Sequence, residues 1–555
     1  MTTTPTFWSN VITYDQNVLQ SFLNPKVTAL SDDSFAIVWE DGTDLFGRHF
    51  DEQGQLTSGN FLGALSSAQT KAISGPQIFQ QPDGRVVVEF NLRFAAGDGD
   101  IIWHSAAFDN STSNQFNIEN SGFDEFLEDA IARPAGQSVG SGSAISYIYA
   151  GPGGPFLVMR LVESLGNQAS NQIFVGFHSG ELQFRSQMDV FDTGNIAIVY
   201  ENFVNATLAR QIRMHIYDPD DSSDVSGEVN VSANNVGAQF PDIAVLGHGL
   251  QFTAVTWQQE GGIAYRLFLG GLAASNVLLI PASSGGLLPK ITALNDGGFM
   301  ILWGQAFGTE SDASPDFDLV VQRFDASGNA VGVKLFIDEP GDQGPFATSI
   351  DTLDDGRVVV TFQNETGDAT GLTTLDYFIL DPREATISGG SDADTIVGRR
   401  EASTINGLGG VDHLIGMNFN DVLDGGDGDD TLAGGKGKDM LTGGLNDDTF
   451  DFNSIAESRA RQADVIKDFG AGDGIDHIDL TDIDAKTGGA NNKFKFIGTQ
   501  AFHDRAGELH YVKHNLAGTT RDTTVVQGDV NGDGRADFQI ILTGLHNLKG
   551  GDFFL

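Results

Sequence analysis

The chain of 555 residues contains no cysteine, so disulfide bonds, thiolate metal sites and cysteine nucleophiles are excluded. Basic residues are also scarce, because 31 Lys and Arg stand against 75 Asp and Glu and leave a net charge of −44. Such a charge repels nucleic acids and anionic membrane surfaces, so neither is expected as a partner. No apolar run reaches the length of a membrane-spanning helix, and membrane insertion is not expected.

Targeting and catalytic motifs are missing as well. The N-terminal stretch MTTTPTFWSNVITYD has neither the basic region nor the apolar core of a secretory signal peptide, so export is expected to be directed from elsewhere. The sequence contains no H-E-x-x-H zinc-protease motif, no G-x-S-x-G elbow, no P-loop and no dinucleotide-binding fingerprint. The 11 histidines form no spaced acid–base pair. The sequence therefore supports no catalytic residue.

Seven consecutive nonapeptides run from Gly389 to Asp451 and follow, with some decay, the pattern G-G-x-G-x-D-x-U-x, in which U is apolar. Glycine reaches turn conformations that leave carbonyl groups and one Asp around a cation, so the pattern predicts a calcium-binding parallel β-roll. A flexible linker would not keep an apolar residue at every ninth position. The predicted metal ligands are Asp394, Asp412, Asp421, Asp430, Asp439 and Asp448, with Gly390, Gly410, Gly426, Gly428, Gly435, Gly437, Gly444, Asp427 and Asp429 in the turns.

Two repeats make one coil of such a roll, so each ion is expected between repeat n and repeat n+2. Odd repeats keep the carboxylate throughout, whereas the first even repeat, GRREASTIN, has Ser403 in its place. We expect an empty or weak site beside this repeat. The roll carries 13 Asp and Glu against 4 Lys and Arg, so several calcium ions are expected to drive its folding, and the calcium-free roll should be partly unfolded.

A second candidate calcium site lies in the stretch DVNGDGRAD. Oxygen-bearing side chains stand at offsets 1, 3, 5 and 9 around a glycine, and these are Asp529, Asn531, Asp533 and Asp537. Position 12 is Ile540, which excludes an EF-hand. The alternative is a solvated Asx turn between strands.

From about Gly389 to its end, the chain resembles the calcium-binding C-terminal domain of serralysin-type secreted proteins, within the broader family of repeats-in-toxin proteins. The resemblance implies export from a Gram-negative bacterium by a three-component type I exporter. That exporter reads an uncleaved C-terminal signal, often one acidic residue followed by three apolar ones. The last four residues fit this signal: Asp552, Phe553, Phe554 and Leu555. The protease half of the serralysins is absent.

Ahead of the roll, a longer phrase recurs with the form P-x-[VI]-x-x-L-x-D-G-x-[VF]-x-V-x-W/F. Its anchors lie near residues 25, 76, 134, 187, 241, 289 and 345, a period of about 50 residues. Four strands fit in each period, which is typical of a propeller blade, so residues 1–385 are predicted to form a seven-bladed β-propeller. The early strand FWSNVITYD is expected to complete the last blade and close the ring. The alternatives are an array of β-sandwiches and a long β-solenoid.

Each second strand of this repeat ends in an aromatic residue, which is predicted to pack between blades. The polar residues that follow are expected to emerge on one face and form a candidate ligand-binding face: Glu40, Asp41, Asn91, Glu201, Asn202, Gln258, Gln305 and Asn364.

Together these patterns predict an all-β chain with a propeller at 1–385, a β-roll at 386–451 and a β-rich C-terminal region with the secretion signal at 452–555. The predicted function is that of a secreted calcium-binding protein whose propeller binds an extracellular glycan or surface component, as an adhesin or lectin does. One alternative is a hydrolase or lyase acting on polysaccharides or esters, favoured if two or more carboxylates converge at the propeller axis. The other is a structural protein of a surface layer or matrix.

Overall fold

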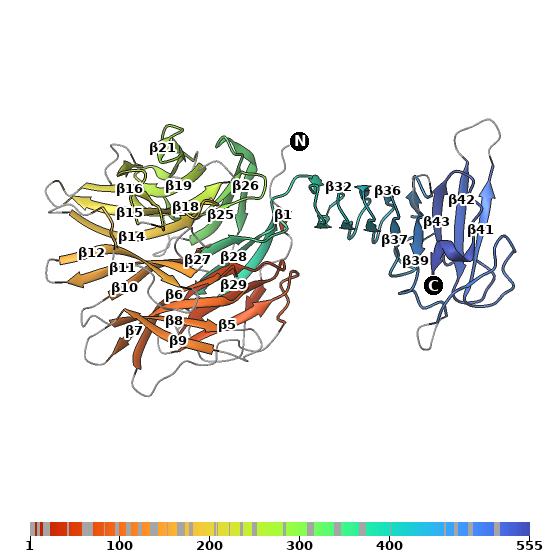
Figure 1. Cartoon of the computed structure of the whole chain (residues 1–555), viewed down its shortest axis with the longest axis horizontal. Helices are drawn as coiled ribbons and strands as arrows, with labels where there is room; N and C mark the ends of the chain where they lie inside the picture. Colours follow the sequence, from red (N-terminus) through yellow and green to blue (C-terminus); the bar gives the residue numbers. More distant parts are fainter. Residues whose placement is uncertain are drawn as a thin grey trace. The chain divides into compact units, whose positions relative to one another are not determined.

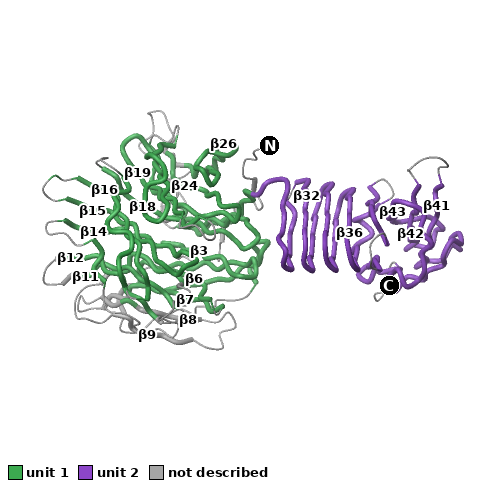
Figure 2. The backbone as a smooth tube through the Cα atoms, turned by 45° about the horizontal axis from the view of Figure 1, so that its top comes forward, with its two compact units in different colours: residues 1–382 green, residues 383–555 purple. Residues whose placement is uncertain are grey.

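The computed structural model contains two compact units, residues 1–382 and residues 383–555, which are coloured separately in Figure 2. The predicted roll at 386–451 and the predicted region at 452–555 lie together in the second unit. The residues described are 6–7, 12–14, 23–41, 44–57, 70–82, 84–94, 99–106, 113–119, 125–133, 142–151, 154–163, 173–176, 181–204, 207, 209–220, 222–232, 237–246, 252–280, 285–307, 316–337, 346–365, 373–399, 401–459, 462–470, 475–486, 492–515 and 522–555.

Antiparallel sheets of sequentially adjacent strands make up the first unit (Figure 1). The first sheet contains β3 (Leu23–Ala29), β4 (Phe35–Glu40) and β5 (Leu45–Phe50). The second contains β6 (Thr70–Gln80), β7 (Val86–Phe94), β8 (Gly99–Ala106) and β9 (Ser113–Glu119). The third contains β10 (Glu125–Arg133), β11 (Gly142–Gly151), β12 (Gly154–Glu163) and β13 (Ile173–Phe174).

The remaining sheets of this unit repeat the plan. The fourth contains β14 (Glu181–Val190), β15 (Ile196–Val204), β16 (Ala209–Tyr217) and β17 (Val229–Asn230). The fifth contains β18 (Gln239–Leu246), β19 (Phe252–Gln259), β20 (Gly262–Leu269), β21 (Leu272–Ala273) and β22 (Leu278–Leu279). The sixth contains β23 (Gly286–Ala293), β24 (Phe299–Phe307), β25 (Asp316–Phe324) and β26 (Ala330–Ile337).

The last sheet joins the two ends of the unit. It contains β27 (Phe346–Thr352), β28 (Val358–Glu365) and β29 (Thr373–Asp381), with β1 (Thr6–Phe7) and β2 (Ile12–Tyr14) both paired to β29. The N-terminal strands thus complete the last blade, as predicted. This closure pairs the edge of β29 with a segment from the opposite end of the unit.

The strand count differs from the prediction of seven four-stranded blades. Among the described residues, six sheets have four or five strands, so six blades are complete. In the described ranges the sheet of β3 to β5 has three strands, and an isolated bridge between Phe50 and Leu56 follows β5; residues 58–69 lie outside the described residues. The anchor placed near residue 134 is also displaced, since the first strand of its sheet is β10, at 125–133.

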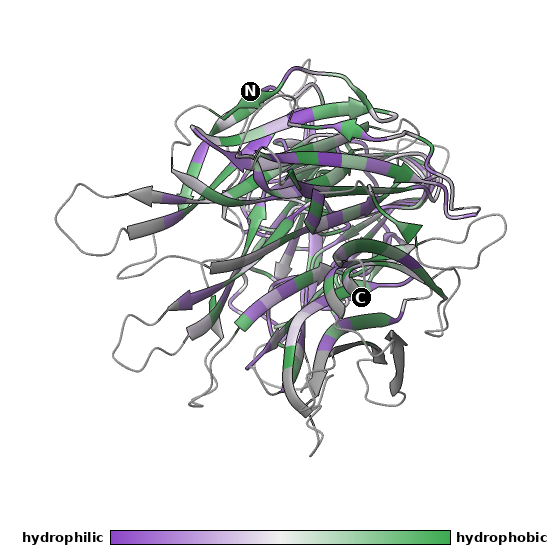
Figure 3. Cartoon of the chain, turned by 90° about the vertical axis from the view of Figure 1, so that its left-hand side faces the viewer, coloured by the Kyte–Doolittle hydropathy of each residue, from purple (hydrophilic) through white to green (hydrophobic). Residues whose placement is uncertain are grey.

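Aromatic residues at the ends of the second strands are buried, as predicted. All are at most 4% exposed: Trp39, Phe90, Tyr200, Trp257, Trp303 and Phe362. Trp257 packs with residues of the preceding sheet such as Met214, and Trp303 packs with Ile263 and Tyr265 of the sheet before it. Figure 3 shows apolar residues running along the strands. The core therefore lies between blades, where each aromatic ring fills the space that sheet twist opens.

The repeated phrase F-D-x-x-G ties neighbouring sheets together. Gly54 and Gly328 have φ of +77° and +82°, and each lies in a tight turn whose backbone favours glycine. The hydroxyl of Tyr377 donates to the Gly54 carbonyl at 2.9 Å, and that of Tyr265 donates to the Gly328 carbonyl at 2.7 Å. In both cases the tyrosine belongs to the preceding sheet, so the phrase links one blade to the next.

The second unit is a roll of two parallel sheets. One sheet runs through β30 (Thr386–Ser388), β32 (Thr404–Gly409), β34 (Val422–Asp427), β36 (Met440–Leu445) and β38 (Asp464–Ile466). The other runs through β31 (Thr395–Val397), β33 (His413–Ile415), β35 (Thr431–Ala433), β37 (Thr449–Asp451) and β39 (His477–Asp479). Ile405 pairs with Leu423, and Leu414 with Leu432. Two nonapeptides therefore make one coil, as predicted.

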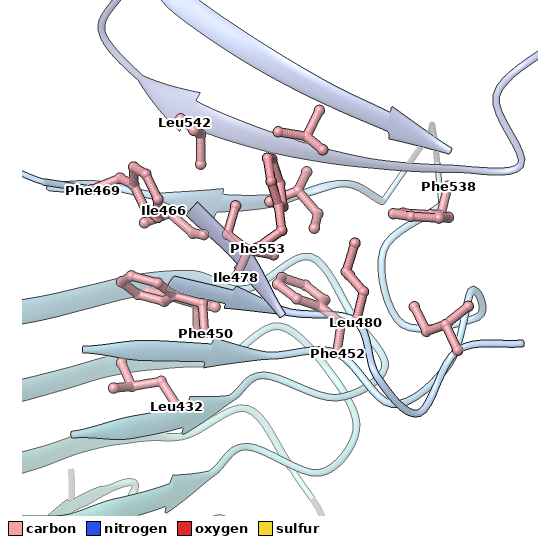
Figure 4. Packing of buried hydrophobic residues seen from close by; sticks show 14 of the residues in the cluster. Leu432, Phe450, Phe452, Ile466, Phe469, Ile478, Leu480, Phe538, Leu542 and Phe553 are labelled. Atoms are coloured by element: carbon pink, nitrogen blue, oxygen red, sulfur yellow. The ribbon is translucent and has the colours of Figure 1, made fainter. Parts of the chain in front are cut away.

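Beyond the nonapeptides, both sheets continue into a β-rich end. The first extends through β43 (Phe538–Thr543), β42 (Thr523–Asp529), β41 (Glu508–His514) and β40 (Lys495–Phe496), and the second ends in β44 (Phe553–Phe554) after a short 3₁₀ turn, η1 (Gly550–Asp552). One apolar core runs through both parts (Figure 4). Because the roll has no separate core, it and the C-terminal strands form one unit.

Candidate functional site

The aspartates at the sixth position of the repeats form two hydrogen-bonded ladders. On the odd side, the backbone N–H of Asp394 donates to Oδ1 of Asp412 at 2.8 Å, and Asp412 donates in the same way to Asp430 at 2.8 Å. Asp430 then donates to Asp448 at 3.0 Å. On the even side, Asp421 donates to Asp439 at 2.8 Å. One carboxylate oxygen of each ladder aspartate from Asp412 onward is thereby fixed by the coil before it, whereas Asp394 accepts the N–H of Gly390 in its own repeat.

The second carboxylate oxygen, Oδ2, has no such donor. Within the described part of the chain, these Oδ2 atoms are buried and accept no hydrogen bond in Asp412, Asp421, Asp430, Asp439, Asp448 and Asp464. An unsatisfied buried oxygen is costly, and a row of them at one coil's spacing needs an explanation. A bound cation supplies one.

The glycines of the repeat leave room for that cation. A Cβ atom on Gly407 would lie 2.3 Å from Oδ2 of Asp412 and 2.4 Å from the carbonyl oxygen of Gly425. One on Gly428 would lie 1.5 Å from the Gly410 carbonyl oxygen. The same clash, at 2.3 Å or less from a carbonyl oxygen of the coil before, recurs at five more of the predicted turn glycines: Gly410, Gly426, Gly435, Gly437 and Gly444. Gly390, in the first repeat, does not show it, because a Cβ there would meet only Oδ2 of Asp394, at 3.9 Å.

Carbonyl and carboxylate oxygens therefore converge where no side chain fits, which is the donor set that calcium prefers. Burial raises the pKa of Asp421, Asp439 and Asp448 to about 7, because the charged form is poorly solvated there. Among the described residues no group of three or more His, Cys, Asp or Glu side chains could hold a metal ion by itself. Backbone carbonyls would have to supply the remaining ligands, as the repeat predicts.

Residues 388–555 match the family of the peptidase M10 serralysin C terminal. The match covers the roll and the strands beyond it, in agreement with the resemblance found in the sequence. No curated protein matches the chain. In the described ranges, no helix is long and apolar enough to span a membrane.

The serralysin-like roll departs from its pattern at the first even repeat. Ser403 stands in the ladder, and its hydroxyl accepts a hydrogen bond from the backbone N–H of Arg399 at 2.9 Å. The side chain of Arg399, which replaces the second glycine, is only 2% exposed and lies 3.6 Å from the Glu401 carboxylate. A buried guanidinium thus adds a fixed positive charge to the turn that lacks its aspartate. This charge would oppose calcium at the same turn, where the sequence predicts an empty or weak site.

Two aspartates beyond the repeats extend the ladders and a third binds turn glycines, and none of the three was predicted from the sequence. Asp464 accepts the N–H of Asp439 at 2.8 Å, and Asp476 accepts that of Asp448 at 3.2 Å. Asp468 accepts the N–H groups of Gly443 and Gly444, both at 3.0 Å. Their spacing of 25 to 28 residues from the ladder breaks the nonapeptide period. The sequence pattern that could have predicted such residues is an Asp directly before a short apolar strand, as in DVI at 464–466.

The loop from Asp529 to Asp537 is arranged differently. Both oxygens of Asp529 accept backbone N–H groups, from Gly532 at 2.6 Å and Gly534 at 2.9 Å. Asp537 accepts the N–H of Val530 at 2.7 Å, and Asn531 accepts that of Asp533 at 2.8 Å. These are the bonds of consecutive Asx turns, so a calcium ion here would have to displace them. The roll fits calcium better than this loop does.

The last four residues are folded into the end of the roll. Asp552 accepts the backbone N–H of Lys549 at 2.7 Å. Phe553 is 5% exposed and packs in the common core, together with the partly buried Leu555. Phe554 stacks on His477, with ring centroids 4.4 Å apart.

The candidate ligand-binding face lies largely inside the first unit. Glu201 and Asn202 are at most 1% exposed, and Glu201 binds Arg185 at 2.9 Å and Arg210 at 2.7 Å. Glu40 is 2% exposed and accepts a bond from Asn24. The other candidates also bond within the protein, as follows: Asp41 with Asp44, Asn91 with Leu127, Gln258 with Leu288, Gln305 with Trp303 and Asn364 with Asp376.

A cavity, called the channel below, lies between the first strands of the sheets of the first unit. It has a volume of about 520 Å³ and is lined by residues of β3, β6, β10, β14, β18, β23 and β27. Four carboxylates on its wall accept a backbone N–H from the first strand of a neighbouring sheet, at 2.6 to 2.9 Å: Asp129 from Met188, Asp189 from Val245, Asp242 from Ile291 and Asp351 from Ala29. These bonds hold the ring of strands together.

One end of the channel opens into a mouth, a cavity of about 420 Å³ that contains residues just before and after the anchors. Its lining includes Glu128, Arg185, Phe240 and Leu288, with Lys26 and Lys290 shared with the channel. Burial raises the pKa of Glu128 to about 7 and lowers that of Lys26 to about 8. Phe240 and Leu288 could have been found from the sequence, because each directly precedes an anchor proline, Pro241 or Pro289.

Among solved structures, the chain is similar to a protein of unknown function from Dyadobacter fermentans, with 11% identity and a TM-score of 0.42 over 67% of this chain and 98% of the other. It is also similar to an α-L-arabinanase from Penicillium chrysogenum, with 11% identity and a TM-score of 0.41 over 69% and 99%. A PL25 ulvan lyase gives 11% identity and a TM-score of 0.41 over 64% and 94%. These similarities are too distant to transfer an activity.

Proposed function

We propose that the chain is a secreted calcium-binding protein of the repeats-in-toxin type, in which calcium orders residues 389–451 outside the cell. The observation that carries this is the row of buried Oδ2 atoms without a hydrogen-bond donor. At submicromolar calcium the carboxylates repel one another and the roll stays extended, whereas about millimolar calcium supplies the free energy that folds it.

Hydrogen exchange of the full chain, followed by mass spectrometry of its peptides, tests this function. With calcium, amides of 389–451 should exchange slowly, and with a chelator they should exchange within seconds, while peptides of β15 and β24 stay protected in both. Magnesium serves as the control, because its smaller octahedral shell suits this donor set poorly. Equal protection of the roll with and without calcium would refute the function.

Export is proposed to follow the type I route of a Gram-negative bacterium, with Asp552, Phe553, Phe554 and Leu555 as part of the signal. Because Phe553 is buried in the folded roll, the exporter would read this segment before calcium folds it. Deleting the four residues should retain the protein inside cells that carry a type I exporter. Unchanged secretion of the shortened chain would argue against this signal.

For the first unit, the proposed role is to bind an extracellular glycan or surface component at the mouth of the channel. The mouth supports this role because it combines an aromatic ring, charged groups and amide groups in one cavity. The unit is further proposed to count seven blades, since seven first strands line the channel. The candidate face residues from Glu40 to Asn364 would then support the strands behind the mouth and would not contact the ligand themselves.

A second candidate is a hydrolase or lyase with its site in the channel. It is favoured by several carboxylates that line the channel, of which Asp129 and Asp351 have a pKa raised by burial to about 6. Release of reducing ends or of unsaturated products from a polysaccharide panel would support it. Loss of that release in an Asp129→Asn variant, with unchanged melting, would assign the activity to the channel.

A further inference from the structure

The mouth lies beside a β-bulge that recurs in the first strands of the sheets. Five sheets place a residue with φ between +50° and +61° at this point: Asn24, Gly75, Arg185, Phe240 and Leu288. Glycine and asparagine adopt this left-handed conformation easily, but arginine, phenylalanine and leucine do not. Strained residues of this kind persist where the surroundings hold them, and they cluster at ligand clamps.

Phe240 of β18 is held in place by Arg185, which belongs to β14 of the neighbouring sheet. The guanidinium of Arg185 lies 4.2 Å from the centroid of the Phe240 ring, and Arg185 is itself fixed by Glu201 at 2.9 Å. The ring is only half-buried and lines the mouth. A rigid aromatic ring at a cavity wall suits the apolar face of a sugar ring, because both are flat and neither loses much conformational entropy.

Two lysines stand deeper in the same cavity. Lys290 donates to Oε1 of Gln187 at 3.0 Å and lies 3.7 Å from the Asp242 carboxylate. Burial lowers the pKa of Lys26, and the charge of Lys290 lowers it further. The two ammonium groups line the same cavity and repel each other, and the carboxylates of Asp129 and Asp242 offset part of that repulsion. An anionic group of a ligand placed between them would relieve that repulsion.

The acidic groups nearby are already engaged. Asp129 accepts the backbone N–H of Met188 at 2.6 Å, and Asp242 accepts that of Ile291 at 2.9 Å. Glu128 accepts bonds from the backbone of Arg185 and Ser186, and its raised pKa leaves it partly neutral near pH 7. Lys26 and Lys290 are thus two charged groups of the lining that can donate to a ligand, beside the Arg185 guanidinium that covers Phe240.

We propose that the mouth binds an acidic saccharide, with one sugar ring against Phe240 and its carboxylate between Lys26 and Lys290. This inference rests on the proposed glycan-binding role and adds the class of ligand. A cavity of about 420 Å³ holds one or two sugar rings, so the site would take the end of a chain or a short branch. The net charge of −44 on the whole chain would repel a long polyanion.

Calorimetric titration of the full, calcium-loaded chain tests the inference. The probes are disaccharides of galacturonic, glucuronic and mannuronic acid, each compared with its neutral counterpart. We expect at least one acidic disaccharide to bind ten-fold or more tightly than its counterpart. Lys26→Gln and Lys290→Gln should each remove most of this preference, and Phe240→Ala should weaken both members of the pair. Lys334→Gln, on the outer strand β26, is the matched control and should change neither.

The outcomes distinguish failure of the glycan-binding role from failure of the acidic ligand or of its site. Binding of neutral sugars that equals binding of acidic ones, with loss in Phe240→Ala, would overturn the acidic ligand and leave the glycan-binding role standing. A preference for acidic sugars that survives both lysine variants would overturn the assigned site. Absence of binding to every saccharide would overturn the inference together with the proposed role. Melting curves of all variants should match those of the parent chain.

Discussion

Replacing Asp430 by Asn should change the roll in opposite directions with and without calcium. Oδ1 of Asp430 accepts the N–H of Asp412 at 2.8 Å, and an amide oxygen can accept the same bond. Oδ2 has no donor, and both it and the carbonyl oxygen of Gly443 lie close to the position of a Cβ on Gly425. An amide NH₂ in that place would donate to the carbonyl oxygen instead of facing it. The calcium-free roll should therefore gain stability.

The size of the change in stability and in calcium affinity follows from replacing a carboxylate by an amide. Satisfying one buried polar group is worth about 1 kcal/mol, and the variant also removes a buried charge whose pKa is raised by its burial and by neighbouring aspartates. With calcium, the variant loses one anionic ligand. A loss of about tenfold in affinity, or about 1.4 kcal/mol, is the smallest effect expected.

Hydrogen exchange of peptides from 389–451, measured in chelator and across a calcium titration, would record both the gain in stability without calcium and the loss of calcium affinity. Asp424→Asn is the control, because it removes the same charge from an exposed position on the neighbouring repeat. The reasoning fails if Asp430→Asn exchanges faster than the parent in chelator. It also fails if the two variants need the same calcium concentration to become protected.

Three further predictions address other parts of the chain. The double variant Arg399→Gly with Ser403→Asp should bind one more calcium ion than the parent by equilibrium dialysis, because it restores a ladder carboxylate and removes a buried cation; an unchanged stoichiometry would contradict the account of the first even repeat. Gly428→Ala should abolish calcium-induced protection of the roll, since its Cβ would lie 1.5 Å from the Gly410 carbonyl oxygen. Gly470→Ala, where a Cβ meets nothing within 4 Å, should keep that protection, and equal effects would refute the close approach. Burial raises the pKa of Asp189 to about 7, so its contribution to stability is present below about pH 4 and is lost as the pH rises through 7. Asp189→Asn should therefore flatten the fall in melting temperature between pH 5 and pH 8, and an unchanged slope would count against the shift.

Local patterns in the sequence determined the parts of the fold that repeat. The apolar eighth position of the nonapeptides predicted the buried row that includes Leu414, Leu432 and Phe450. The sixth position predicted a row of aspartates as calcium ligands, and the parallel register stacks each of them on its equivalent 18 residues later, which forms the ladders. The aromatic ends of the second strands were predicted in the same way. Periodic burial can be predicted from the sequence because each coil or blade packs against its neighbours in the repeat.

Tertiary structure alone decided what the repeats leave open. Glu201 and Asn202 follow an aromatic residue, as surface residues would, yet they are buried where inner strands bulge and need polar partners. Asp464 and Asp476 join the ladders only because the loops before them return the chain to the roll. Lys26 and Lys290 are far apart in sequence and meet in one mouth because the propeller closes on itself. A site assembled by ring closure has no local signature, since no single repeat contains it.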